Sequence, residues 1–109
     1  MTDKELLELA ANACNWVLED DDDEGLSWIV WGDNNVPMDG WNPITDDGDA
    51  LRLAVKLRMD LKIEFDRIDA YAESNYAVEY LYDLPSPSDP YAATRRAIVR
   101  AAAEIGKTL

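Results

Sequence analysis

Two stretches in the first half of the chain repeat hydrophobic residues at the spacing of an amphipathic helix. The first covers residues 3–15 and starts at Thr2 and Glu5, a capping box in which both side chains satisfy first-turn amides. The second covers residues 46–58, with aspartates in its first turn and basic residues toward its end, as the helix dipole favours. We therefore expect a helix at each position.

A third helix is predicted to begin at Asp89 and Pro90, an N-cap aspartate followed by proline at the first helical position. Its apolar stripe consists mainly of alanine, which indicates close packing against a neighbouring element. Gly106 is the expected C-cap, because glycine readily adopts the left-handed conformation that ends many helices.

The other hydrophobic runs predict three strands, at residues 26–31, 61–66 and 76–82. The second alternates strictly, which places Leu61, Ile63 and Phe65 on its core face. A connection near residues 72–75 makes the last two strands an antiparallel hairpin. The order α-β-α-β-β-α predicts an α+β fold, with a narrow, mainly antiparallel three-stranded sheet layered between helices.

The composition narrows the chemistry available to this chain. Its 109 residues suffice for one domain, residues 1–109. It has no histidine and a single cysteine, Cys14, which excludes a disulfide within the chain, a structural zinc site, and serine or cysteine triads. Cys14 lies on the apolar side of the first helix and is expected to be buried. We predict a protein that is not an enzyme and uses no cofactor or metal.

The net charge of −13 is confined to the first half of the chain. Residues 1–50 hold 14 acidic residues and one basic residue, whereas the two signs balance in residues 51–109. The densest part is expected to be a solvated loop of six carboxylates: Glu19, Asp20, Asp21, Asp22, Asp23 and Glu24. Such a field repels nucleic acids and acidic membranes and attracts basic proteins. The competing interpretation is that the charge serves only solubility.

Other candidate sites fit the residues poorly. An EF-hand loop starting at Asp20 has Trp31 at position 12, and tryptophan cannot ligate calcium. The carboxylate pairs Asp33 with Asp39 and Asp47 with Asp49 have no predicted apolar cleft for acid–base chemistry. Three arginines of the last helix form either a solvated face paired with the acidic half or a small basic patch: Arg95, Arg96 and Arg100.

Four tryptophans fall within 26 residues around the acidic run: Trp16, Trp28, Trp31 and Trp41. Tryptophan is enriched at the energetic centres of protein interfaces. Trp28 or Trp31 is expected in the core, because a strand has two faces. Polar and turn residues flank Trp16 and Trp41, which makes these two the candidate exposed anchors for a partner. The alternatives are that all four belong to the core, or that they mediate a homodimer.

Two segments resemble small proteins of tailed phages and prophages that are grouped as the phage α-β-α sandwich domain family. Residues 41–57 are similar to its aromatic-Asn-Pro and Asp-Ala segment, and residues 89–103 resemble its closing helix. The resemblance implies a phage or prophage origin and a sheet sandwiched by helices. It implies no catalytic residues, and the acidic run at residues 19–24 departs from the family pattern.

Together these features favour a phage-encoded, non-enzymatic accessory protein of the host bacterial cytoplasm. No apolar run approaches the roughly 20 residues that a membrane span requires, and no secretory signal is visible at the start. We expect it to bind and inhibit a host protein with a basic surface, such as a nucleic-acid-processing or defence complex of the kind that anti-CRISPR proteins target. The acidic surface would act as a nucleic-acid mimic. The alternative is a structural or regulatory phage adaptor.

Overall fold

The computed structural model describes residues 2–20, 28–72, 75–80 and 89–108, and it has the α+β fold expected from the sequence. Its helices are α1 (Asp3–Ala13), α2 (Asp47–Lys56) and α3 (Pro90–Lys107). One antiparallel sheet consists of β1 (Val17–Asp20), β2 (Trp28–Trp31) and β3 (Pro37–Asp39), with a 3₁₀ turn, Asp33–Asn35, before β3. A second antiparallel sheet consists of β4 (Asp60–Ile63), β5 (Arg67–Ala72) and β6 (Asn75–Tyr80).

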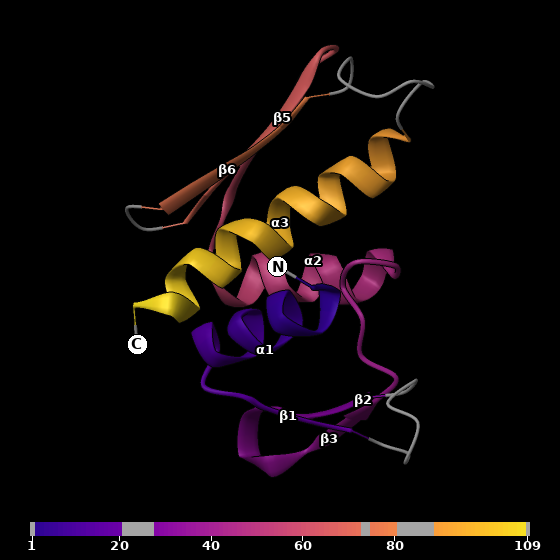
Figure 1. The fold of residues 1–109 in the computed structure, drawn as a ribbon, viewed down its shortest axis with the longest axis vertical. Coiled ribbons are helices and arrows are strands. Elements are labelled where there is room, and N and C mark those ends of the chain that lie inside the picture. Colours follow the sequence, from indigo (N-terminus) through magenta and orange to yellow (C-terminus); the bar gives the residue numbers. More distant parts are fainter. Residues whose placement is uncertain (1, 21–27, 73–74, 81–88, 109) are drawn as a thin grey trace.

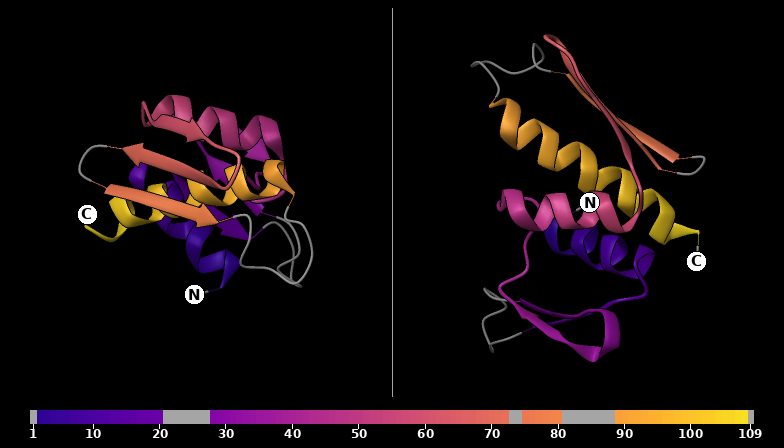
Figure 2. Two further views of the ribbon diagram at one scale, coloured as in Figure 1. Left: turned by 90° about the horizontal axis from the view of Figure 1, so that it is seen from above. Right: turned by 180° about the vertical axis from the view of Figure 1, so that it is seen from behind.

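The layering is the reverse of the predicted one. Figure 1 shows the helices as a middle layer, with the β1–β2–β3 sheet on one side and the β4–β5–β6 sheet on the other. The views in Figure 2 agree, and they place α3 between α1 and α2. The predicted narrow, antiparallel three-stranded sheet is confirmed, but the described residues form two such sheets, and they lie outside the helices instead of between them. Of the six strands in the described residues, three are not predicted from the sequence: β1 and β3 belong to the first sheet, and β5 belongs to the second.

The predicted helix starts are confirmed. Thr2 accepts a hydrogen bond from the Glu5 amide and caps α1, Asp46 caps α2, and Asp89 precedes Pro90 as the cap of α3. The Gly106 prediction is wrong, because α3 continues to Lys107. Gly106 instead lies against α1, where an added Cβ would be 1.9 Å from the carbonyl oxygen of Leu9. Its missing side chain allows the two helices to touch.

The first sheet contains part of the predicted acidic loop. Glu19 and Asp20 belong to β1, and they pair with Ile29 and Trp28 of β2, so the prediction of a loop is wrong for these two residues. Asp21, Asp22, Asp23 and Glu24 lie outside the described residues, as do the first two residues of the predicted strand 26–31. A strand tolerates Glu19 because its side chain points away from the helices, where water solvates it.

In the second sheet, β5 lies between the two strands that were expected to form a hairpin. Leu61 and Ile63 face the helix layer, as Ile68 does, but β4 is an edge strand and leaves them exposed. Phe65 follows β4 and is 89% exposed. Leu61 and Ile63 therefore lie on the predicted core-facing side without being buried, and the prediction of a core-facing side chain is wrong for Phe65.

The helix layer supplies both halves of the core. On one side, α1, α2 and α3 enclose Trp16, Val30 and Trp41. On the other, alanines of α3 meet alanines and Ile68 of β5 and β6, so the sheet approaches the helix closely. Within the described part of the chain, no helix is long and apolar enough to cross a bilayer.

Candidate partner-binding surface

The outer face of the β1–β2–β3 sheet carries an acidic and an aromatic side chain in contact. The indole Nε1 of Trp31 donates a hydrogen bond of 3.1 Å to Oε2 of Glu19. Strand register places Val17 directly opposite Trp31, and Ile29 opposite Glu19. Because Leu18, Val30 and Met38 of the same strands pack toward the helices, these four side chains lie on the face that points to solvent. We call Val17, Glu19, Ile29 and Trp31 the outer face.

The outer face suits a basic side chain of another protein. Val17 is exposed, Ile29 and Trp31 are half-buried, and Glu19 is exposed. A lysine or arginine can pair with a carboxylate while its side chain lies over an aromatic ring, where the electrons of the ring attract the cation. Neither the alternation of residues 17–20 nor their pairing with β2 was recognised from the sequence. The alternation of Val17 and Glu19 with Leu18 was the available signal.

Trp16 and Trp41 are not exposed anchors, contrary to the sequence prediction. Trp41 is 1% exposed and Trp16 is 7% exposed, and their rings meet edge to face with centroids 6.1 Å apart. The left-handed backbone of Asn15 helps the chain turn from α1 into β1, which directs Trp16 inward. Trp41 Nε1 has no hydrogen-bond partner among the described residues. These two tryptophans hold the core under the outer face.

Trp16 also belongs to a polar cluster at the end of α2. Its Nε1 donates to Oδ1 of Asp33 at 3.2 Å, and Lys56 Nζ donates to the same oxygen at 2.9 Å. The hydrogen bond from Lys56 lowers the pKa of Asp33, and the same bond raises the pKa of Lys56. Each polar group thus has a partner inside the cluster, which joins the 3₁₀ turn to α2.

Cys14 lies beside this cluster and is buried, as predicted. Burial raises the pKa of its thiol from 9.0 to about 12, although the nearby Lys56 acts in the opposite direction. A thiol with so high a pKa is almost wholly protonated at neutral pH and is a poor nucleophile. The cluster therefore supports a structural role for Cys14.

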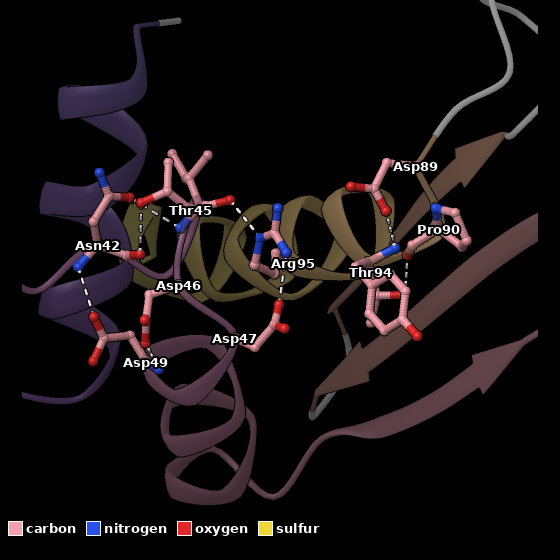
Figure 3. A network of polar contacts seen from close by, with 11 residues as sticks. Asn42, Thr45, Asp46, Asp47, Asp49, Asp89, Pro90, Thr94 and Arg95 are labelled. Atoms are coloured by element: carbon pink, nitrogen blue, oxygen red, sulfur yellow. Dashed lines mark hydrogen bonds and ion pairs between the residues drawn. The ribbon is translucent and has the colours of Figure 1, made fainter.

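The motif residues at the start of α2 form a second polar network, shown in Figure 3. The Asn42 amide donates to Asp49 at 3.0 Å, and the Asp49 amide donates to Asp46 at 2.8 Å. From α3, Arg95 donates to the Ile44 carbonyl oxygen at 2.8 Å and to Asp47 at 2.6 Å. The two segments that carry the family resemblance therefore meet here, and their polar side chains cap helices and join them.

Other candidate carboxylates and arginines form ion pairs within the chain. Asp33 pairs with Lys56, Asp47 with Arg95, and Asp49 with Arg52, so these carboxylates have structural partners. Arg95 pairs with the acidic half as expected, whereas Arg96 and Arg100 both pair with Glu79 of β6. No cluster of three or more potential metal ligands occurs among the residues that the structure describes.

Comparison of the chain with protein-family models, with curated proteins and with solved structures finds no match. The outer face and the helix-capping network are therefore interpreted from their own geometry.

Proposed function

We propose that this chain is a non-enzymatic binding protein whose outer face occupies a basic surface of another protein. The contact between Glu19 and Trp31 carries the proposal. It places a carboxylate and an aromatic ring side by side on a solvent-facing sheet, next to Asp20 at the end of β1. The acidic run continues along the chain from that point, so the partner's cations would meet a field of one sign.

The partner we propose is a host protein built to hold nucleic acid, and the effect of binding is inhibition. A chain with a net charge of −13 competes with a phosphate backbone for the same lysines and arginines. The apolar members of the outer face, Val17 and Ile29, supply contacts that a nucleic acid does not make and so favour this protein over its competitor. The resemblance at residues 41–57 and 89–103 supports a phage or prophage origin and action in the bacterial cytoplasm.

The test is affinity capture from lysate of the infected host, at low and at moderate salt, with binding then measured on the purified partner. Glu19→Gln and Trp31→Leu are each expected to weaken binding about tenfold, because each removes one half of the acidic and aromatic contact. Glu104→Gln is the matched control, since it removes one exposed carboxylate from the far end of α3 and should leave affinity unchanged.

A second variant replaces Asp20, Asp21, Asp22 and Asp23 with asparagine. It should weaken binding and flatten its dependence on salt, because fewer ion pairs are lost to screening. Capture of virion components with unchanged affinity for this variant would overturn the proposal and favour the structural or regulatory adaptor.

A further inference from the structure

The side of α2 that faces away from the core carries exposed apolar residues beside the ion-paired Arg52 and Lys56. Leu51 is 61% exposed and Val55, one turn later, is 66% exposed, whereas Ala50, Leu53 and Ala54 of the same helix are buried. Val36 and Ile63 lie on either side and are 57% and 62% exposed. Clustered exposed aliphatic side chains usually mark an interaction surface. We call Val36, Leu51, Val55 and Ile63 the α2 surface.

Two grooves run along the α2 surface. One, of about 510 Å³, lies between α2 and the 3₁₀ turn and is lined by Val36, Met38 and Val55. The other, of about 490 Å³, lies between α2, β4 and the start of α3 and is lined by Leu61 and Ile63. Leu51 lines both grooves and thus forms the ridge between them. Figure 2 shows α2 at the edge of the helix layer, where a second molecule can approach it.

The charges around α2 cancel, in contrast to the rest of the acidic half. Asp49 pairs with Arg52 at 3.1 Å, Asp33 with Lys56 at 2.9 Å, and Asp47 with Arg95 at 2.6 Å. Two copies of a chain with net charge −13 repel each other, most strongly where unpaired carboxylates come together. The α2 surface is one where two copies can approach without bringing unpaired carboxylates together.

The charges of α2 also suit an antiparallel arrangement with a second copy of the same helix. Its first turn holds Asp47 and Asp49 and its last turn holds Lys56, each also paired within the chain, and Arg58 follows two residues after Lys56. Arg58 is exposed and makes no ion pair with any other described residue. An antiparallel pair of such helices places each acidic start beside the basic end of the other, which is the symmetry that a two-fold dimer requires.

We propose that the α2 surface is the interface of a homodimer in which two α2 helices pack antiparallel about a two-fold axis. Leu51 of each copy packs on Val55 of the other, and Arg58 lies near Asp47 of the other. Because the outer face lies on a different layer of the molecule, it stays free in the dimer. A dimer then presents two acidic faces, and a partner with two basic sites binds it with higher avidity.

Analytical ultracentrifugation of the whole chain across a range of concentrations tests the dimer. The expected result is a species of twice the 12.3 kDa chain mass that dissociates on dilution. The double variant Leu51→Gln, Val55→Gln should raise the dimer dissociation constant about 100-fold, because two apolar contacts are lost on each side. Val17→Gln is the control, since this exposed side chain lies on the outer face and its loss should leave the dimer intact.

Charge reversal tests the orientation of the two helices. Arg58→Glu should weaken the dimer, whereas Arg58→Lys should keep it. A chain that is monomeric at every concentration, or a dimer unaffected by the Leu51 and Val55 changes, would overturn the proposal. Circular dichroism of each variant separates loss of the dimer from loss of the fold, because all three substituted residues are exposed.

Salt separates this proposal from the proposed function. Raising sodium chloride from about 0.05 M to about 0.5 M screens the repulsion between two acidic chains, so dimerisation should tighten. Binding of a basic partner should weaken over the same range, because attraction between opposite charges is screened. Either result can therefore fail while the other holds.

Discussion

Gly106 shows how a single missing side chain allows α1 and α3 to pack. A Cβ at this position would lie 1.9 Å from the Leu9 carbonyl oxygen and 2.7 Å from its carbonyl carbon. Both atoms belong to the backbone of α1, so neither can move without shifting that helix. Since α3 contributes to both halves of the core, a shift between α1 and α3 affects the whole molecule.

Gly106→Ala is therefore expected to destabilise the protein by about 3 kcal/mol or more, although alanine favours helix more than glycine does. Chemical denaturation followed by circular dichroism measures the free energy of unfolding. Gly48→Ala is the comparison: its Cβ would meet the side-chain ends of Asp46 and Arg52, at 3.2 and 3.3 Å, and no backbone atom within 4 Å, so its loss should be smaller even though Asp46 caps α2. A loss below 1 kcal/mol at Gly106 would contradict the close contact.

Cys14 is expected to make stability fall at alkaline pH. Its pKa is about 12 in the folded chain against an ordinary value of 9.0, so folding favours the protonated thiol. This contribution is complete below pH 9 and is lost as the pH rises toward 12. At pH 10 the loss should be about 1 kcal/mol relative to Cys14→Ala, measured as the difference between their denaturation curves. An equal loss of stability in the natural chain and in the Cys14→Ala variant would show that groups other than Cys14 cause it.

At the scale of elements, the joint between α2 and α3 depends on Arg95. Its guanidinium donates to the Ile44 carbonyl oxygen, just before α2, and to Asp47 in the first turn of that helix. The Arg95 side chain is only 17% exposed, which reduces screening by water. Arg52 forms a comparable ion pair with Asp49 on the surface of α2, where its side chain is 65% exposed.

Arg95→Met should cost about 2 kcal/mol of unfolding free energy, because it leaves the Ile44 carbonyl oxygen without its donor and removes the ion pair. Arg52→Met should cost less than about 0.5 kcal/mol, as is usual for exposed ion pairs. Thermal and chemical denaturation of both variants provide the comparison. Equal losses of unfolding free energy would mean that the Arg95 contacts stabilise the protein no more than the exposed ion pair of Arg52 with Asp49 does.

At the scale of the whole molecule, the helices form the layer between the two sheets (Figure 1). Ile98, Val99, Ala102 and Ala103 of α3 face one half of the core, and Ala97 and Ala101 face the other. Met59, between α2 and β4, packs against both. The second sheet packs directly on α3, whereas the first sheet belongs to a core cluster that α3 shares with α1 and α2.

We expect both sheets to unfold in one transition, as a single domain would. Hydrogen exchange of the central strands β2 and β5, measured in one sample, should give opening free energies within about 1 kcal/mol of each other. Much faster exchange of β5 would show that the second sheet opens by itself, and would contradict the single-domain prediction.

Much of the local structure was determined by the sequence alone. Thr2 and Asp89 cap α1 and α3 as predicted, and α2 begins at its predicted position with Asp46 as its cap, because a cap depends on amides within a few residues of its own side chain. The burial of Cys14 was predicted from helical spacing in the same way. The outer face was predicted only in part. The sequence indicated that carboxylates and tryptophans lie close together, but its pattern favoured Trp16 and Trp41 as the exposed tryptophans, whereas Trp31 is the one that contacts Glu19.

Tertiary structure decided the rest, because it depends on which segments meet. The polar neighbours of Trp16 and Trp41 suggested exposure, yet the chain turns both rings into the core. Strand β5 has alanines where a typical strand has larger residues, since α3 approaches it closely, and its pattern was too weak to recognise alone. Leu61 and Ile63 alternate as core residues do, but an edge strand leaves them uncovered. The chain's acidity was plain from its composition, whereas the sheet that carries Glu19 exists only through its pairing with β2.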